Sequence, residues 1–317
     1  MTTVDSYAET LGSLSGASVR KHFDAFEDIA WDSPEYAIDK SDPRWVLSTI
    51  DPIGRHPWYR ALPLGRQIEI GLWRQANICK VGLQFENVLI RGLMEYVNTL
   101  PNGSPEFRYC THEATEETHH TQMFQEFVNR SGADVPGGRL LFRVLAPFLP
   151  LAARVVPEIF FVGVLAGEEP IDHVQKQALR SSEEIHPLYE RIMQIHVAEE
   201  ARHISFAHEY LRQTVPRLNT LRRALLSVAL PIIMRVLCDV ILIPGKQMTR
   251  DVGVPRAVIR DVYWDAPESR VALRDLFGDV RMLAEEIDVM NPVSRLLWKA
   301  MKINGRPSRY RGAPAAA

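Results

Sequence analysis

The sequence predicts an all-α protein built on a four-helix bundle, and three observations support this fold class. From residue 66 to residue 213, no segment shows the period-two alternation of polar and apolar residues that a strand requires. Apolar residues recur there at spacings of three and four, which places them on one face of a helix. Prolines and glycines divide the region into four long helical segments with connections of intermediate length, as in an antiparallel bundle.

The first bundle helix is predicted from residue 66 to residue 96, where prolines are absent and Ile70, Trp73, Leu89 and Leu93 form an apolar stripe. The turn residues Asn102-Gly-Ser-Pro105 end this segment. The other three helices are expected over residues 106–129, over 139–180 with interruptions near Pro150 and Pro157, and over 187–213.

Further segments flank this bundle core, which we place at about residues 66–213. Residues 1–65 are rich in turn signals such as Asp51-Pro52, so we expect short helices and irregular wrapping there. No flexible linker separates the segments, which predicts a single domain over residues 1–317. The C-terminal helical addition is expected over 214–303, with helical patterns at 221–244, 256–262 and 268–303, a loop near 244–255, and a basic tail at 304–317.

Composition excludes several classes of protein. The chain has 37 Lys and Arg residues against 39 Asp and Glu, so no overall positive field exists to attract nucleic acid. Its three cysteines, Cys79, Cys110 and Cys238, are too few and too widely spaced for a disulfide framework or a zinc ribbon. The first ten residues contain Asp5 and Glu9 where a secretion signal would be basic and then apolar. We therefore expect a cytoplasmic protein.

Two apolar stretches, residues 140–167 and 224–245, resemble membrane spans only in part. Charged residues interrupt both of them, and the longest uninterrupted run is the eleven residues from Ala224 to Met234. A spanning helix needs about 20 apolar residues. We expect buried core helices and no integral membrane segment, with peripheral membrane contact as the alternative.

Candidate chemistry concentrates between residues 112 and 208, which contain eight of the ten histidines. Two strings in helical segments contain Glu-x-x-His: Glu117 with His120, and Glu200 with His203. Residues three apart share a helix face, so each pair can bind the same metal ion. One such pair is weak evidence, because surface helices are rich in both residue types.

The spacing of two further glutamates strengthens this interpretation. Glu86 precedes Glu117 by 31 positions, and Glu169 precedes Glu200 by the same 31. A glutamate, a helix reversal and then Glu-x-x-His, occurring twice, is the ligand plan of two-metal carboxylate sites in four-helix bundles. The alternative pair Glu116 and His119 fits the local motif but not the repeat.

His196 distinguishes the two halves of the pattern. It precedes Glu200 by four positions and His203 by seven, so these three side chains share one helix face. His196 is a candidate seventh ligand, which would give one metal more imidazole than the other; the alternative is a histidine that only supports the ligands or packs in the core. The first half has Glu113 at the equivalent position, and we interpret it as a supporting or solvated residue.

The ligand set favours iron or manganese over zinc or magnesium. Four carboxylates balance two divalent cations, oxygen with imidazole ligands suits iron and manganese, and no thiolate is present in the pattern. Other catalytic plans lack their motifs, since the sequence has no Gly-x-Ser-x-Gly, no Gly-x-Gly-x-x-Gly and no phosphate loop.

These residues resemble the p-aminobenzoate N-oxygenase (AurF-like) family of ferritin-like diiron oxygenases. The resemblance covers about residues 66–213, and His196 is its most specific part. It implies two iron ions, with manganese as a substitute, and dioxygen as co-substrate. It also implies a monooxygenase that oxidises an aromatic amine nitrogen with electrons from an external donor, and a homodimer. By this resemblance the metal ligands are Glu86, Glu117, His120, Glu169, His196, Glu200 and His203.

The substrate is less constrained than the metal site. Apolar helices next to the ligands predict a cavity for a small aromatic or apolar substrate. Arg235 and Asp239, four residues apart, are expected to form a structural ion pair, with anchoring of a substrate carboxylate as the alternative. Two other classes remain open: another diiron oxygenase, oxidase or desaturase, with Tyr109 or Tyr189 as a radical-forming residue, and a ferritin-like iron-binding protein.

Overall fold

The structure is a computed structural model that describes residues 3–308, and these residues form helices and no strands. The predicted all-α class is therefore confirmed. The four long helices begin and end close to the predicted residues. They are α3 (Leu64–Val97), α4 (Pro105–Ser131), α7 (Pro157–Arg180) and α8 (Pro187–Thr214).

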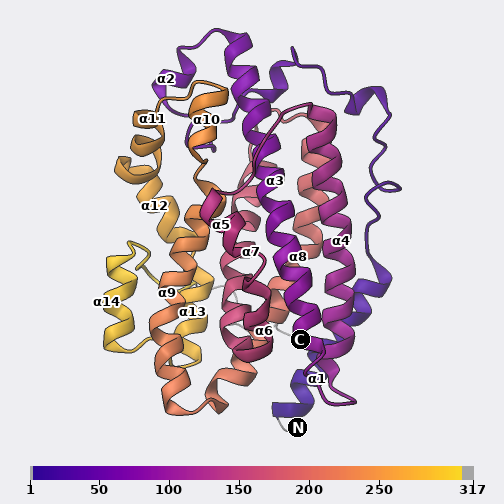
Figure 1. Ribbon diagram of the computed structural model, residues 1–317, viewed down its shortest axis with the longest axis vertical. Coiled ribbons are helices and arrows are strands. Elements are labelled where there is room, and N and C mark those ends of the chain that lie inside the picture. The colour runs from indigo at the N-terminus through magenta and orange to yellow at the C-terminus, as the bar shows by residue number, and fades with distance from the viewer. Residues whose placement is uncertain (1–2, 309–317) are drawn as a thin grey trace.

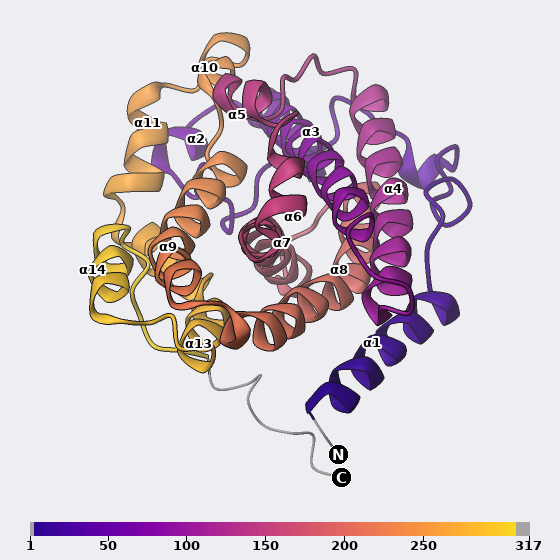
Figure 2. The same cartoon turned by 60° about the horizontal axis from the view of Figure 1, so that its bottom comes forward.

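The four long helices run side by side along the longest axis of the molecule (Figure 1). The closest packing is between α3 and α4 and between α7 and α8, while α3 also contacts α7 and α4 contacts α8. When the molecule is turned so that its lower end comes forward, α7 lies near the centre of the view, among the other helices (Figure 2). This arrangement lets all four helices present side chains to one interior region.

The predicted third helix is interrupted as expected, because Pro150 and Pro157 lie at the starts of new elements. Residues 139–180 contain α5 (Leu140–Leu145), the 3₁₀ turn η3 (Leu149–Leu151), α6 (Ala152–Val155) and α7.

Three expectations about the flanking segments need correction. Residues 3–20 form one helix, α1, rather than short pieces, and it packs across α4 and α8. The predicted loop near 244–255 contains the short helix α10, and the predicted helical segment 268–303 is divided into the three helices α12, α13 and α14. Arg309 and Arg311 of the predicted basic tail lie outside the described residues. The remaining elements are α1 (Thr3–Arg20), η1 (Pro34–Tyr36), η2 (Pro43–Trp45), α2 (Pro57–Arg60), η4 (Val215–Arg217), α9 (Thr220–Leu242), α10 (Lys246–Asp251), α11 (Arg256–Arg260), the π-helical turn η5 (Asp261–Asp265), α12 (Pro267–Asp275), α13 (Gly278–Glu286) and α14 (Pro292–Ala300).

Helix α9 belongs to the one stretch of the described chain, Thr220–Asp251, that is long and apolar enough to cross a membrane. Its most apolar window has a mean hydropathy of 2.3 and is 44% buried inside the protein. α9 packs on α7 and α14, so it covers the bundle as a core helix does. A single helix of this kind is weak evidence for a membrane span.

Two apolar clusters flank a polar layer in the bundle. One cluster contains residues 89–97 of α3 and 204–211 of α8, and the other contains residues 68–79 of α3 and 188–195 of α8. Between these clusters, the same helices present buried glutamates and histidines. The candidate site therefore lies in the middle of the bundle, enclosed by apolar side chains above and below.

Candidate metal centre

Four helices bring seven buried acidic and imidazole side chains together in this polar layer. Each of the seven is at most 2% exposed. α3 supplies one glutamate, α4 a glutamate and a histidine, α7 one glutamate, and α8 two histidines and a glutamate. The seven residues are Glu86, Glu117, His120, Glu168, His196, Glu200 and His203.

Their possible ligand atoms fall into three overlapping groups, within each of which all atoms lie within 4.8 Å of one another. Glu200 belongs to two of these groups, as do Glu86 and Glu117, so the side chains offer neighbouring cation positions that share carboxylates. The groups are Glu86 with His120, His196 and Glu200; Glu117 with Glu200 and His203; and Glu86 with Glu117 and Glu168.

The structure brings six of the seven predicted residues together in this cluster, and the seventh, Glu169, is not part of it. Glu168 lies in the position expected for Glu169. The Glu169 carboxylate instead forms a buried hydrogen bond with Nε2 of His208 on α8. Adjacent helical residues point about 100° apart, so both side chains cannot face the same centre.

The helix connections explain why the structure places Glu168, and not Glu169, in the cluster. The reversal between α3 and α4 spans residues 98–104, whereas that between α7 and α8 spans residues 181–186. Equal spacing along the sequence therefore does not preserve the helix face. α7 also contains Pro170, which lacks the amide hydrogen that continues the helical ladder next to the two glutamates.

Close packing of α3 against α7 places Glu168 beside Glu86. At Gly167 a side-chain Cβ would lie only 2.5 Å from the ring of Phe85, so the glycine permits this approach. The residues that follow Phe85 and Gly167, Glu86 on α3 and Glu168 on α7, both face the polar layer. A larger residue at position 167 would separate the two carboxylates.

Each histidine of the Glu-x-x-His pairs turns Nδ1 toward the cluster. Nδ1 of His203 lies 2.7 Å from Oε1 of Glu117, and Nδ1 of His120 lies 2.9 Å from Oε2 of the same glutamate. Both Nδ1 atoms are 3.4 Å from Oε1 of Glu200. The two imidazoles therefore face the same carboxylates from opposite helices.

The other ring nitrogen of each histidine is held by a carboxylate from the opposite helix. Nε2 of His120 lies 2.9 Å from Glu199 on α8, and Nε2 of His203 lies 2.8 Å from Glu116 on α4. A carboxylate behind a metal-binding histidine fixes the ring orientation and raises its basicity. The arrangement thus has the form of two carboxylate–histidine pairs related by an approximate exchange of α4 and α8.

Arg202 connects these two supporting carboxylates. Its Nη2 donates to Oε1 of Glu116 at 2.8 Å and to Oε1 of Glu199 at 3.4 Å. The backbone N–H of Phe23, from the N-terminal segment, also donates to Glu199 at 3.2 Å. Within residues 3–308, no arginine or lysine forms an ion pair with the four carboxylates of the cluster itself. The positive charge in the cluster must therefore come from its imidazoles or from a bound cation.

Several ligand atoms of the cluster lack hydrogen bonds although they are buried. These atoms are Oε2 of Glu86 and both carboxylate oxygens of Glu200. Buried polar atoms are normally satisfied, and unpaired ones cost about 1–3 kcal/mol each. Four carboxylates and three imidazoles with unsatisfied atoms directed into one interior region fit a pair of divalent cations.

Burial and mutual repulsion raise the pKa of two carboxyl groups. The pKa of Glu86 lies well above its usual value because the group is buried and faces Glu117, Glu168 and Glu200. Burial and the charges of Glu200 and Glu117 raise the pKa of Glu168 in the same way. The cluster therefore holds more negative charge than it can accommodate without added positive charge.

Two histidines compensate for this charge. Burial alone would lower the pKa of His120, but the nearby Glu117 raises it to about 10. His203 is likewise buried, and Glu200 and Glu117 raise its pKa well above the usual value. In contrast, burial lowers the pKa of His196 to about 4, so this imidazole is neutral at pH 7. A neutral imidazole is the form that binds a metal ion.

The remaining candidate residues are separated from the cluster or support it. His119 is partly exposed, with Nδ1 3.6 Å from Asp24. Glu113 is completely buried, and both of its carboxylate oxygens lack hydrogen bonds. Arg235 and Asp239 form the expected ion pair at 2.9 Å.

Sequence reasoning missed Glu168 as a member of the cluster, and Glu116, Glu199 and Arg202 as its supports. A signal for three of them was present, because each of α4, α7 and α8 carries two adjacent glutamates. In α4 and α8 the second glutamate of the pair faces the cluster, and in α7 the first does. The sequence contained no comparable signal for Arg202.

The fold and the site define a class of protein: an all-α bundle with a buried carboxylate and imidazole cluster that can hold metal ions. The sequence matches the p-aminobenzoate N-oxygenase AurF family over residues 4–288, and the chain belongs to this family. Membership supports an oxidoreductase of the diiron oxygenase type. The chain is also similar to proteins described as uncharacterized from Mycobacterium bovis and Mycobacterium tuberculosis. Each is 56% identical over 308 residues, which cover 97% of this chain and 91% of the relative.

Proposed function

We propose that this protein is a non-haem diiron monooxygenase that uses dioxygen to oxidise the nitrogen of an aromatic amine. The observation that carries the proposal is the buried set of four carboxylates and three imidazoles, with shared carboxylates between adjacent groups. Membership of the N-oxygenase family supports the reaction type.

The residues that would hold the metal ions are Glu86, Glu117, His120, Glu168, His196, Glu200 and His203. Iron is the proposed metal, with manganese as a substitute, because carboxylate and imidazole ligands suit both. When bound and reduced, a pair of iron ions would supply the electrons and the open coordination positions that dioxygen activation needs. An external donor would restore those electrons after each turnover.

The chain's own groups prepare the site for this chemistry. Glu199 and Glu116 orient the imidazoles of His120 and His203, so these ligands need little rearrangement on metal binding. The apolar clusters on both sides exclude bulk water. Exclusion of water limits side reactions of oxidising species and strengthens electrostatic interactions inside the site.

A pairing of two chains is part of the proposal. Helix α9 presents exposed apolar residues at positions 221, 225, 228, 232 and 236, which form one stripe along its surface. A stripe of this length supports burial against a second copy, as the family resemblance predicts. The protein is proposed to act in the cytoplasm, and its mass in solution would test the predicted homodimer.

The test is anaerobic reconstitution with ferrous iron, followed by addition of ¹⁸O₂ and an arylamine. We expect two irons per chain by metal analysis and a product whose mass increases by labelled oxygen. The control is Glu117→Ala, which removes a carboxylate common to two ligand groups and should abolish both iron binding and oxygen transfer. Iron binding without labelled product from a broad set of arylamines would reject the proposed reaction.

A further inference from the structure

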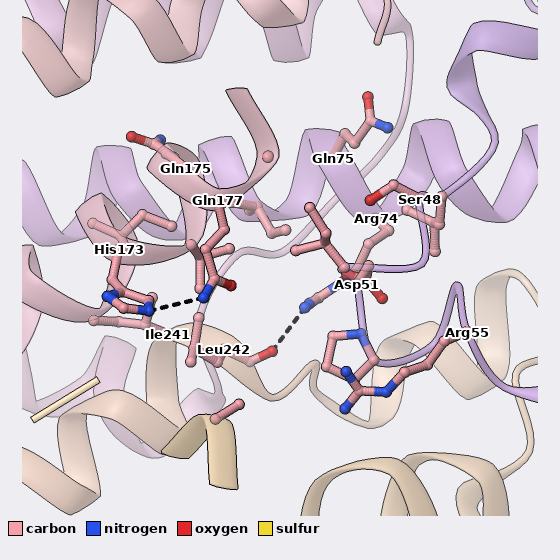
Figure 3. A pocket seen from close by; sticks show the side chains of 18 of the residues that line it. Ser48, Asp51, Arg55, Arg74, Gln75, His173, Gln175, Gln177, Ile241 and Leu242 are labelled. Atoms are coloured by element: carbon pink, nitrogen blue, oxygen red, sulfur yellow. Dashed lines mark hydrogen bonds and ion pairs between the residues drawn. The ribbon is translucent and has the colours of Figure 1, made fainter. Parts of the chain in front are cut away.

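A cavity of about 390 Å³ lies beside the metal centre, between the N-terminal loops, α3, α7, α8 and α9. Figure 3 shows His173 and Gln177 hydrogen-bonded to each other at one end, with Asp51, Arg74 and Arg55 at the other. Much of the remaining lining is apolar, including Ile78, Ile171 and Ile241. We call this space the outer cavity.

A smaller chamber of about 30 Å³ shares part of its lining with the outer cavity and part with the metal centre. Glu86, Glu168 and His196 line this inner chamber, so it reaches the candidate metal ligands directly. The two spaces share a wall of five residues, which we call the neck: Ile78, Ile171, Gln175, Tyr189 and Ile241. The neck is therefore the part of the outer cavity nearest to the candidate metal ligands.

Most cations that line the outer cavity are already neutralised by carboxylates. Nε of the buried Arg74 lies 3.2 Å from Asp51, and its Nη2 donates to the backbone carbonyl of Leu242. Arg235 is paired with Asp239 at 2.9 Å. Arg44 is likewise paired with Asp42 at 2.6 Å. Arg55 donates to the hydroxyl of Ser269 and lines only the outer cavity. The neck itself contains no cationic residue.

The cavity also contains hydrogen-bond acceptors without donors. The side-chain oxygens of Gln75 and Gln175 are buried and lack hydrogen bonds, and both residues are more than nine-tenths buried. Gln175 lies in the neck, where its amide oxygen can accept from an N–H group of a ligand. A carboxylate cannot pair with that oxygen and would have only the neutral amide N–H groups of Gln175 to accept from.

We propose that the substrate is a neutral aromatic amine with a second apolar group beyond its ring, and that a one-ring aminobenzoate anion is disfavoured. This inference rests on the proposed function. The inner chamber of about 30 Å³ is smaller than a ring, so an aminobenzoate with its nitrogen turned toward the metals would keep its ring along the neck and its carboxylate at the outer end of the neck. An anion there would be desolvated with no cation beside it and with only the neutral Gln175 and Tyr189 as possible donors, which is costly. The outer cavity is more than twice the size of a cavity of about 150 Å³ that binds benzene, so it accommodates a further group.

The test measures ligand binding to the metal-loaded protein by calorimetry without dioxygen, so that no turnover occurs. The ligands are 4-aminobenzoate, its neutral counterpart 4-aminobenzamide, and the two-ring amine 4-aminobiphenyl. We expect 4-aminobiphenyl to bind at least about tenfold more tightly than 4-aminobenzoate, with the benzamide between them. Equal or tighter binding of 4-aminobenzoate would overturn the inference, and this comparison needs no variant.

Gln175→Leu tests the role of the neck acceptor. Loss of one hydrogen bond should weaken binding of 4-aminobenzamide about fivefold, because its amide N–H groups lie at the far end of the ring. Binding of 4-aminobiphenyl, which has no donor there, should change less than about twofold. The matched control is Gln194→Leu, an exposed glutamine of α8 outside both cavities. Equal weakening of both ligands would contradict the role assigned to Gln175.

Failure of this inference and failure of the proposed function give different results. If 4-aminobiphenyl binds most tightly but no amine gains oxygen in the aerobic assay, the cavity assignment holds and the reaction is rejected. If 4-aminobenzoate binds most tightly and is oxidised, the reaction holds and the substrate assignment is rejected.

Discussion

The helix pairs α3/α4 and α7/α8 contribute similar side chains to the site, but they are not equivalent. Each pair supplies one separate glutamate and one Glu-x-x-His string. The second pair adds His196, whereas the corresponding position of the first pair is Glu113. The repeated part provides balanced charge for two cations, and the added imidazole makes their surroundings different. Two similar helix pairs thus build a cluster whose candidate metal positions have different surroundings.

The largest expected effect compares Glu168 with Glu169. Glu168→Ala removes a carboxylate from the cluster, so we expect loss of at least one metal ion per chain by metal analysis. Glu169→Ala should retain the full metal content. It should instead lower the free energy of unfolding by about 1–3 kcal/mol, because buried His208 loses its hydrogen-bond partner.

Denaturant unfolding of both variants in the metal-free form provides the control, since it separates stability from metal binding. Full metal content in Glu168→Ala together with loss in Glu169→Ala would restore the register predicted from sequence spacing. The two helix pairs would then be more alike than the structure indicates.

A second test asks whether the two supporting carboxylates are equivalent. Glu199→Gln and Glu116→Gln each remove a charge behind one histidine while keeping the side-chain size. We expect each change to weaken metal affinity about 10–100-fold, as measured by competition with a chelator. Glu190→Gln on the surface of α8 is the matched control. A loss confined to one variant would mean that only one half depends on its carboxylate–histidine pair.

A third prediction concerns the pH dependence of metal binding. In the metal-free protein the pKa of His120 is raised to about 10, chiefly by Glu117 against the effect of burial, so a metal ion must displace this proton. Affinity should therefore rise with pH, by roughly tenfold per pH unit for each proton released. Calorimetry in buffers of different ionisation enthalpy measures that number at pH 7. Release of no proton would mean that His120 is not a ligand.

The sequence predicted the helices of the bundle well because apolar spacing and prolines are local signals. Glu-x-x-His and the position of His196 four residues before Glu200 are patterns within one helix, and they predicted five members of the cluster, while Glu86 was predicted from the spacing of the repeat. Glu168 could not be chosen over Glu169 in this way, because the face presented by α7 depends on its packing against α3 at Gly167 and on the length of the following connection. The contacts of Arg202 and Phe23 with Glu199 join distant segments, and no local pattern specifies them.

The smallest expected effect on metal content is at Glu113, the counterpart of His196. Burial raises the pKa of Glu113 well above its usual value, which favours the protonated carboxyl group in the folded protein. An unfolded chain releases this proton above a pH of about 4.3, and stability contributed by the folded state is therefore lost as pH rises. The Glu113→Gln variant has no such proton, so it should be at least as stable as the natural protein at pH 7, increasingly so at higher pH.

The Glu113→Gln variant should also keep its full metal content, whereas His196→Gln should lose metal affinity. Thermal unfolding and metal analysis of the two variants measure these differences. Loss of metal from Glu113→Gln would make position 113 a metal ligand and would remove the asymmetry that His196 introduces.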